Sequence, residues 1–346
     1  MKTIEPYVPG EQPQDKKYIK LNTNENPYPP SPKVLEAITQ EVVGDLRLYP
    51  DPSCHRLIDA ISKCHNLSPE QVFAGNGSDE VLAFAFLAYF NEGDTILYPD
   101  ITYSFYPVYS NMFQVNYKRI PLDDDFDIIV DKYKANNDGI IIANPNAPTG
   151  KALPLEKIRE ILEWNKNQVV IVDEAYVDFG CESAVSLIQE FNQLLVVQTM
   201  SKSRSLAGMR IGYAMGNPEL IDGLNRVKNS VNSYTMDRLA IVAGEAAMID
   251  KKYFDDICYR IIKTREWVVC ELKNLGFHVI DSAANFVFAS PASIEAKKLF
   301  LELKQNGLLV RYFDKPRINN YLRISIGTDE EMKAFIKGVK LILENE

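Results

Sequence analysis

Lys202 has unusual neighbours for a lysine. In TMSKSRSLAGMRIGY, residues 199–213, it lies between two serines, with Arg210 eight residues later and the apolar run LLVVQT directly before it. A lysine that forms a Schiff base needs small neighbours, and nearby hydroxyls and an arginine suit a phosphate. The segment therefore suggests covalent attachment of a phosphorylated carbonyl cofactor. An ordinary solvent-facing lysine is the alternative.

A carboxylate and a tyrosine follow another apolar run. In VDEAY, Asp173 ends a run that should be buried on both faces, so its carboxylate needs a cationic or N–H partner. Tyr176, three residues later, would lie near it if the chain turns helical. Paired with a protonated pyridine nitrogen, Asp173 would make that ring an electron sink for a carbanion at the substrate α-carbon. Asp173 could instead simply cap the turn.

Two further segments could bind parts of the same cofactor. GNGSDE, residues 75–80, precedes an apolar helix and would place Gly77 and Ser78 at a helix N-terminus, which suits a phosphate. Taken alone, this segment is better explained as a tight turn with Ser78 or Asp79 as N-cap. It lacks the GxGxxG pattern, which argues against NAD. Tyr103 in ITYSFY offers a ring that could stack on the cofactor.

The elements that must position these residues are short apolar runs separated by helical patterns. The runs lie at 71–74, 95–98, 139–143, 168–173, 194–199 and 210–215. Apolar runs without alternation, separated by helices such as that expected over 154–167, favour a mostly parallel sheet covered on both faces. Polar, glycine-containing or aromatic motifs follow the first five runs. Because ligands bind outside the carboxyl ends of such strands, we expect one convergent site.

The sequence predicts three parts. Residues 1–32 are rich in Pro, Asn and Tyr without periodicity, and we expect an arm that packs on the small domain or a dimer partner. Residues 33–240 would form the large domain. Residues 241–346 would form a smaller α+β domain, in which a long helix precedes short strands at NFVFAS and LRISIG and a final helix from Asp329.

Composition excludes several classes of protein. The 346 residues carry a net charge of −9 without a basic block, which disfavours nucleic acid and anionic membranes as partners. Five cysteines and three histidines show no metal-ligand spacing, so we expect no metal and reduced thiols in a cytoplasmic protein. The N-terminus lacks the apolar core of a signal peptide, and the apolar run at 81–90 is too short to span a bilayer.

The motifs together resemble the fold-type I aminotransferases that depend on pyridoxal 5′-phosphate (PLP). SKSRSLAGMRIGY, VDEAYVDF and NPNAPTG carry this resemblance, which covers essentially the whole chain. IEPYVPG, IKLNTNENPYPPSPKV, LRLYPDPSCHRL, GLLVRYF and YLRISIGT are similar to histidinol-phosphate aminotransferases in particular. The resemblance implies an α/β, aspartate-aminotransferase-like fold, with a mostly parallel seven-stranded sheet between helices plus the smaller domain.

The resemblance also implies roles for residues around the cofactor. Lys202 would form the Schiff base and act as general acid and base, Asp173 would hold the pyridinium N–H, and Tyr176 would bond the ring hydroxyl. Tyr103 would stack on the ring. The phosphate would be bound by Gly77, Ser78, Ser201 and Arg210, and by Tyr49 from the partner subunit of a homodimer. Asp79 would also be among the cofactor-binding residues.

Substrate contacts are implied near both ends of the chain. Tyr7 and Arg311 would face the substrate phosphate, and Arg323 would fork onto the α-carboxylate of the amino donor, a geometry that favours arginine. Asn24 would line the same pocket. Without the resemblance, Arg311 and Arg323 read as strand-end charges and Tyr49 as a packing tyrosine.

One position departs from the family pattern. The family usually has Asn directly before Pro-Thr-Gly, where it bonds the cofactor's ring hydroxyl, and here that position is Ala147. Asn144 or Asn146 could take over this contact, or Tyr176 could make it alone. We expect Asn146 among the cofactor ligands.

The resemblance implies a transaminase that interconverts L-histidinol phosphate and 2-oxoglutarate with imidazole-acetol phosphate and L-glutamate in histidine biosynthesis. A threonine-phosphate decarboxylase or an aromatic or aspartate aminotransferase of the same fold is the nearest alternative. A non-catalytic module that binds PLP or an effector is a more distant one, and a dehydrogenase is the most distant.

Overall fold

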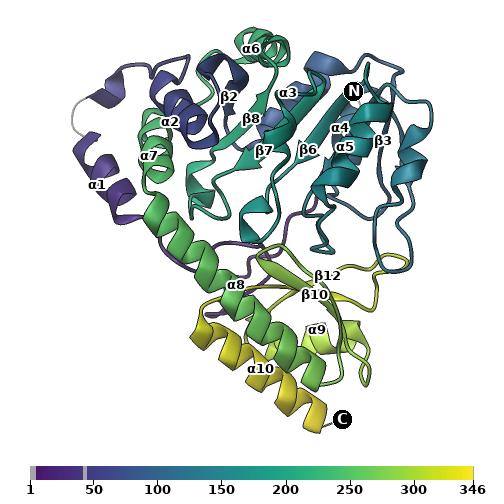
Figure 1. Ribbon diagram of the computed structural model, residues 1–346. Helices are drawn as coiled ribbons and strands as arrows, with labels where there is room; N and C mark the ends of the chain where they lie inside the picture. Colours follow the sequence, from purple (N-terminus) through teal and green to yellow (C-terminus); the bar gives the residue numbers. More distant parts are fainter. Residues whose placement is uncertain (1–4, 42–44, 346) are drawn as a thin grey trace.

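A seven-stranded sheet forms the centre of the larger part of the molecule (Figure 1). The structure is a computed structural model that describes residues 5–41 and 45–345. The ends of the expected arm and small domain, residues 1–4 and 346, and residues 42–44 lie outside the described residues. In spatial order the strands are β2 (Val72–Gly75), β8 (Gly212–Gly216), β7 (Leu194–Thr199), β6 (Val169–Asp173), β5 (Gly139–Ala143), β3 (Thr95–Pro99) and β4 (Asn116–Ile120).

Strand direction brings five of the sequence motifs to one edge of this sheet. β8 pairs antiparallel with both β2 and β7, and the remaining neighbours pair in parallel. The strands β2, β3, β5, β6 and β7 therefore all point the same way. Their carboxyl ends, after which the polar motifs follow, meet at a common edge, as the sequence predicts.

Helices cover both faces of the sheet, which confirms the predicted layers. Ile140 and Ile142 of β5 pack into one apolar cluster with α2 (His55–His65), α5 (Leu155–Trp164) and α7 (Arg238–Ile249). Ile141, between them, faces the opposite cluster with α3 (Ser78–Tyr89), α4 (Tyr106–Phe113) and α6 (Pro218–Val231). Because successive side chains of a strand point to opposite faces, one apolar run serves two cores. Helix α1 (Pro32–Glu41) packs on α7.

The smaller part contains a four-stranded antiparallel sheet. Its order is β12 (Arg311–Tyr312), β13 (Leu322–Ser325), β10 (Phe286–Ser290) and β9 (His278–Ile280). Helices α8 (Lys251–Asn274), α9 (Ala296–Gln305) and α10 (Asp329–Glu344) pack with it around a separate apolar core. Figure 1 shows α8 running from beside α7 down to the small sheet, with α10 alongside.

The N-terminal segment is tied to the small sheet region. Its strand β1 (Ile19–Lys20) pairs in parallel with β11 (Leu308–Leu309). In Figure 1 the purple segment passes between the two sheets before it reaches α1. Residues from the beginning of the chain can therefore meet residues from both parts. Short 3-10 turns lie at Asp45–Arg47, Pro69–Gln71, Val130–Lys134, Val177–Phe179, Ala184–Leu187 and Ala207–Met209.

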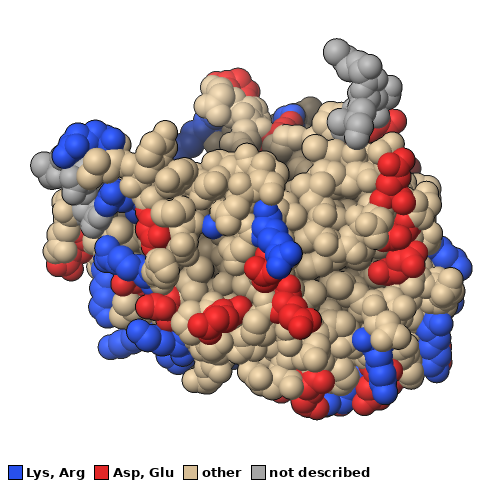
Figure 2. Space-filling view, turned by 90° about the horizontal axis from the view of Figure 1, so that it is seen from above, with Lys and Arg blue, Asp and Glu red and all other residues tan. Residues whose placement is uncertain are grey.

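Charged side chains of both signs are interspersed on the face seen from above (Figure 2). Broad uncharged areas separate them, and neither sign forms a continuous field. None of the helices that the structure describes combines the length and apolarity that a bilayer crossing requires.

The close packing of β8 on the start of α3 generates a stability prediction. A Cβ atom on Gly212 would lie 2.2 Å from the Ser78 nitrogen and 2.3 Å from the Gly77 carbonyl carbon. Since backbone atoms cannot move aside cheaply, Gly212→Ala should lower the free energy of unfolding by about 1–3 kcal/mol. Urea unfolding measures this loss. Gly208→Ala is the control, because a Cβ there meets no atom within 4 Å; equal losses for both variants would contradict the packing argument.

Candidate active site

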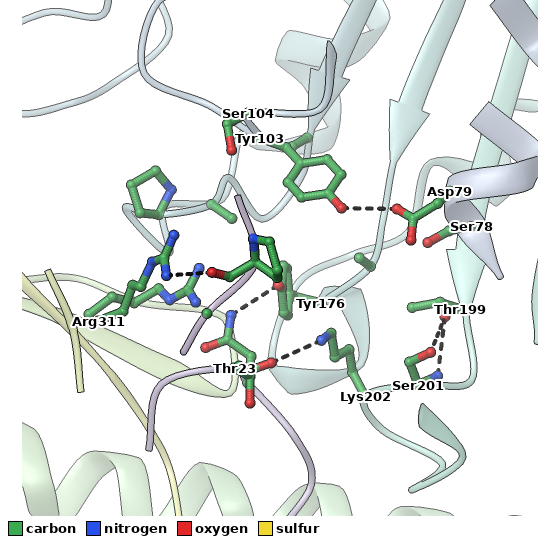
Figure 3. Close-up of a pocket in the computed structure, with 18 of the residues that line it drawn as sticks. Thr23, Ser78, Asp79, Tyr103, Ser104, Tyr176, Thr199, Ser201, Lys202 and Arg311 are labelled. Atoms are coloured by element: carbon green, nitrogen blue, oxygen red, sulfur yellow. Dashed lines mark hydrogen bonds between the residues drawn. The ribbon is translucent and has the colours of Figure 1, made fainter. Parts of the chain in front are cut away.

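The carboxyl ends of the parallel strands open on a cavity of about 240 Å³. It lies between the large sheet, the small sheet and the N-terminal segment, and Figure 3 shows side chains from all three converging on it. Twelve of the residues singled out in the sequence line it: Tyr7, Asn24, Ser78, Asp79, Tyr103, Asp173, Tyr176, Ser201, Lys202, Arg210, Arg311 and Arg323.

Lys202 presents an amine with few partners to this cavity. It follows β7, and its backbone carbonyl accepts a hydrogen bond from Asn26 Nδ2 at 2.9 Å, which holds the segment. Its Nζ donates to the Thr23 carbonyl at 3.3 Å and lies 5.8 Å from the centre of the Tyr176 ring. Within the described residues, no carboxylate forms an ion pair with it. The amine is therefore available to a ligand.

Asp173 is a buried carboxylate that ends β6. Its Oδ2 accepts the hydroxyl of Tyr106 at 2.8 Å, and its Oδ1 accepts the amide N–H of Ala175 at 3.3 Å. Burial raises the pKa of Asp173 to about 6, and these two hydrogen bonds oppose that rise. The carboxylate is therefore mostly ionised at neutral pH and still lacks a cation.

Sequence analysis missed Tyr106. It is the first residue of α4, one turn beyond Tyr103, and it is fully buried. The available signal was the spacing of the two tyrosines in ITYSFY. Nothing in that spacing says that the second ring turns toward β6, because that depends on how α4 packs on the sheet. Burial and the nearby Asp173 carboxylate raise the pKa of Tyr106, so it stays a hydrogen-bond donor.

The start of α3 can hold an anion together with Arg210. The first-turn amides of a helix have no intrahelical acceptor, and the helix dipole favours negative charge there. Gly77, at φ +85°, precedes the helix, and a Cβ on it would come within 2.5 Å of Arg210 Nη2. Glycine thus lets the guanidinium lie against this turn. Arg210 also pairs with Asp79 Oδ2 at 3.1 Å. The Tyr103 hydroxyl donates to Asp79 Oδ1 at 2.9 Å (Figure 3).

Three expected residues do not line the cavity. Gly77 lies directly behind it, as described. The amide nitrogen of Asn146 donates to the Ile101 carbonyl at 2.9 Å and to Thr149 Oγ1 at 3.0 Å, so its side chain holds its own loop instead. Tyr49, expected to act in a neighbouring subunit, is 78% exposed and stacks on Tyr234 with ring centres 4.6 Å apart.

Neither Asn144 nor Asn146 replaces the asparagine side chain that the family usually has at the position of Ala147. Asn144 exchanges hydrogen bonds with the backbone of Leu153, and Asn146 is engaged as described. The Ala147 methyl packs in a small apolar cluster with Ala284 and Phe286. The wall around Tyr176 is therefore apolar on this side.

Two arginines lie directly opposite each other at the other end of the cavity. Arg311 of β12 and Arg323 of β13 are cross-strand partners, an arrangement that is destabilising for like charges. In the described chain, neither has a carboxylate partner. Arg323 Nη2 donates to the Asn22 carbonyl at 3.0 Å, and its buried Nε has no acceptor. Arg311 donates to the carbonyls of Val8 and Pro9 at 3.2 Å each.

The arm covers this end of the cavity. Tyr7 stacks on Phe105 with ring centres 4.6 Å apart, and burial raises the pKa of Tyr7 although the two arginines oppose this. Burial lowers the pKa of Arg323, but a guanidinium stays charged in a protein. Four cationic side chains and two carboxylates line the cavity, so this site in an acidic protein is locally positive.

This arrangement has the parts of an enzyme that attaches a phosphorylated carbonyl cofactor to a lysine. The model of the family "Aminotransferase class I and II" matches residues 16–339, and the chain belongs to this family.

Its sequence is 58% identical over 340 residues to the histidinol-phosphate aminotransferase of Clostridium acetobutylicum, covering 98% of this chain and 97% of that protein. It is 55% identical to the enzyme of the same name from Clostridium beijerinckii, covering all of this chain and 96% of that one.

Solved structures share the fold. The histidinol-phosphate aminotransferase from Sinorhizobium meliloti in complex with pyridoxal-5′-phosphate has a TM-score of 0.87 at 24% identity, covering 95% of this chain and 92% of that one. Aspartate aminotransferase from Thermus thermophilus with maleate has a TM-score of 0.79 at 18% identity, covering 93% and 91%. These likenesses confirm the predicted aspartate-aminotransferase-like fold.

The buried Asp173 generates a prediction about stability and pH. Its pKa is about 6 in the folded protein, above the ordinary value of 3.8, so ionisation of Asp173 opposes folding as pH rises through 6. Asp173→Asn should therefore stabilise the cofactor-free protein at pH 8, by up to about 3 kcal/mol. Urea unfolding at several pH values measures the difference.

This gain should shrink as pH falls from 6 toward 4, because the wild-type carboxyl is then neutral in both states. Asp222→Asn, at an exposed ion pair on α6, is the control and should show no such dependence. A wild-type protein as stable as Asp173→Asn at pH 8 would contradict the assigned burial cost.

Proposed function

We propose that this chain is a histidinol-phosphate aminotransferase that uses PLP and acts in histidine biosynthesis. The facing arginines Arg311 and Arg323 carry this proposal from the structure. Two like charges held opposite each other without a carboxylate need an anion, and they lie across the cavity from the amine of Lys202. The relatives at 55–58% identity bear this enzyme name over nearly their whole length.

The residues present fit PLP. Its phosphate suits the first-turn amides of α3 at Ser78 and Asp79, together with Ser201 and Arg210. Its ring suits the face of Tyr103, with Asp173 at the ring nitrogen and Tyr176 at the ring oxygen. When bound, PLP supplies an electron sink that stabilises negative charge on the substrate carbon.

The chain's own residues position the reactants and move protons. Asp173, ionised at neutral pH and fixed by Tyr106, is the counter-charge for a protonated ring nitrogen. The Nζ of Lys202, without a carboxylate partner, holds the cofactor and can take and return a proton at the substrate carbon. The arm and the small sheet close the cavity and exclude water from these steps.

The arginine pair explains how one site serves two substrates. Glutamate carries a carboxylate on the carbon that bears its amine, and histidinol phosphate carries its phosphate on the neighbouring carbon, so each substrate places an anionic group close to the reacting amine. Arg323, with its free Nε, is the fork for a carboxylate or phosphate, and Arg311 adds a second charge beside Tyr7. Arg311 also holds the carbonyls of Val8 and Pro9, so anion binding and closure of the arm are coupled.

We propose a homodimer in the cytoplasm. Tyr49 is not among the residues that line the cavity of its own chain, and its exposed ring stacks on that of Tyr234. Leu46, Leu48 and Val231, which are close to these two tyrosines in sequence, are exposed as well. Such a patch favours burial against a second copy, where Tyr49 would reach the partner's cofactor phosphate. Five unbridged cysteines agree with a reducing compartment.

The decisive experiment follows the cofactor and then the substrate. Purified protein mixed with PLP should develop a visible absorption band, and borohydride should fix the cofactor to the peptide that contains Lys202. Histidinol phosphate and 2-oxoglutarate should then yield glutamate. Lys202→Ala is the control and should give neither the reduced adduct nor glutamate.

Other outcomes redirect the assignment. A protein that takes up no PLP would overturn the enzyme class. A protein that binds PLP but releases carbon dioxide from threonine phosphate, without forming glutamate, would be a decarboxylase of the same fold. A protein that turns over aspartate or aromatic amino acids but not histidinol phosphate would be an aspartate or aromatic aminotransferase instead.

Subunit complementation tests the shared site. Lys202→Ala and Tyr49→Ala proteins should each be nearly inactive alone. A mixed dimer would contain one site with both changes and one site with neither. Refolding the two together should therefore restore up to about a quarter of wild-type activity, since about half the dimers are mixed and each has one intact site. Recovery no greater than the sum of the separate proteins would contradict the role of Tyr49.

A further inference from the structure

Asn24 is held on every side by hydrogen bonds at the wall of the cavity. It is 1% exposed and adopts a left-handed φ of 56°, which asparagine tolerates better than most residues. Its backbone N–H donates to Ser325 Oγ at 2.9 Å, and its carbonyl accepts from Asn285 Nδ2 at 3.0 Å. The side chain therefore starts from a fixed backbone.

The hydrogen bonds of Ser325 determine which way the Asn24 amide points. Ser325 Oγ accepts from the Asn24 backbone and donates to Asn24 Oδ1 at 2.9 Å. If the amide were reversed, the buried serine hydroxyl would lose the acceptor for its proton. The Nδ2 atom consequently faces Tyr176 and donates to its Oη at 3.0 Å.

This contact decides what the Tyr176 hydroxyl can do. Its oxygen accepts a hydrogen bond from Asn24 Nδ2, so the hydroxyl can still donate its own proton in a second hydrogen bond. In residues 5–41 and 45–345, no other hydrogen-bond partner of Tyr176 Oη is found. Asn144 and Asn146 are engaged elsewhere, and Ala147 has no polar group. The hydroxyl proton of Tyr176 is therefore available for a hydrogen bond to a ligand in the cavity.

We propose that Asn24 is a positioning residue for Tyr176: its amide occupies the acceptor side of the tyrosine oxygen and directs the phenolic proton to the ring oxygen of PLP. The proposal rests on the proposed function. Because Ala147 supplies no amide here, Tyr176 is the donor to that oxygen, and Asn24 sets its direction from a position 152 residues earlier in the chain.

The consequence lies in the protonation of the nitrogen through which Lys202 holds the cofactor. A donor at the ring oxygen withdraws electron density from it, so the oxygen attracts the proton on the neighbouring nitrogen less strongly. That nitrogen then loses its proton at a lower pH. Loss of the donor should raise the pH of this change, which is visible as the midpoint of the shift in the cofactor's absorption band.

The test is a double-mutant cycle on this spectral midpoint, with PLP bound. Asn24→Gly removes the amide and accepts the positive φ, and should raise the midpoint by about half to one pH unit, the equivalent of a lost or misdirected hydrogen bond. Tyr176→Phe should shift it in the same direction. The double variant should shift no further than Tyr176→Phe alone, because Asn24 acts through the tyrosine.

Two further variants sharpen the result. Asn24→Asp keeps the shape but offers a carboxylate that accepts the phenolic proton and withdraws it from the cavity, so the midpoint should again rise. Asn22→Ala is the matched control. Its side chain also lines the cavity, but its Nδ2 bonds the Glu11 carbonyl and not Tyr176, and the midpoint should stay at the wild-type value.

The outcomes separate the two proposals. A normal wild-type band with no shift in Asn24→Gly or Asn24→Asp would overturn the positioning role while leaving the proposed function intact. An equal additional shift in the Tyr176→Phe background would also overturn it, because Asn24 would then act independently. A wild-type protein without a visible band would overturn the proposed function, and this inference with it.

Discussion

Asp173 ends β6 and Lys202 follows the neighbouring strand β7. Both face one cavity, yet they do not form an ion pair. Opposite charges in a site of low dielectric attract strongly, so the protein must hold them apart. It does so by giving the carboxylate other partners, the Tyr106 hydroxyl and the Ala175 amide, and by fixing the lysine segment through Asn26. The amine and the carboxylate thus remain available to different ends of one ligand.

The sheet makes this separation rigid. Asp173 of β6 pairs in register with Val197 of β7, and Lys202 is the third residue beyond the end of β7. The two groups therefore begin from fixed places along one edge. β8 returns antiparallel beside β7, and Gly212 lets the turn before α3 pack directly on it. The end of the cavity at the start of α3 is therefore positioned by the same strands as the end at Lys202.

The opposite end depends on chain segments far apart in sequence. Pairing of β12 with β13 sets Arg311 opposite Arg323, and pairing of β1 with β11 brings the arm beside them. Like charges directly opposite each other destabilise a sheet, and an anion bound between the two arginines would offset this cost. Binding of that anion should then also hold the arm, through the contacts of Arg311 with Val8 and Pro9.

Sequence reasoning predicted the motif-bearing strands because buried parallel strands are continuous apolar runs. The six expected runs correspond to β2, β3, β5, β6, β7 and β8. It gave no range for β4, whose sequence NYKRI is mostly exposed at the sheet edge and has no apolar run. The antiparallel direction of β8 could not be predicted either, since that depends on its neighbours in space.

In the candidate site, too, sequence reasoning found the residues that local patterns mark and missed the contacts that depend on tertiary packing. Lys202, Asp173 and Arg210 follow from strand ends and residue chemistry. Tyr106 and the contact between Asn24 and Tyr176 do not, because each joins residues from separate elements through a single hydroxyl. Asn146 was expected at the cofactor from its place in NPNAPTG, but its amide fits the loop behind Thr102 and Thr149 better than the cavity. Local sequence cannot show to which side of a loop an amide turns.

Two adjacent carboxylates show how surroundings assign different roles to similar groups. Glu174 follows Asp173 and is also buried, and burial raises its pKa to about 7. It accepts hydrogen bonds from the Ser183 hydroxyl, the Ala184 amide and Gln198 Nε2, at 2.6, 2.6 and 2.8 Å. Its oxygens are thus engaged within the protein, and Glu174 is not among the residues that line the cavity.

Asp173, with one hydroxyl and one long amide contact, is left with acceptor capacity directed at the cavity. The same dipeptide therefore supplies one carboxylate that ties β6 to β7 and another that faces the cavity without a cationic partner. A buried carboxylate of the first kind is satisfied when the chain folds. One of the second kind costs stability until its ligand binds, which is why the two cannot be told apart by burial alone.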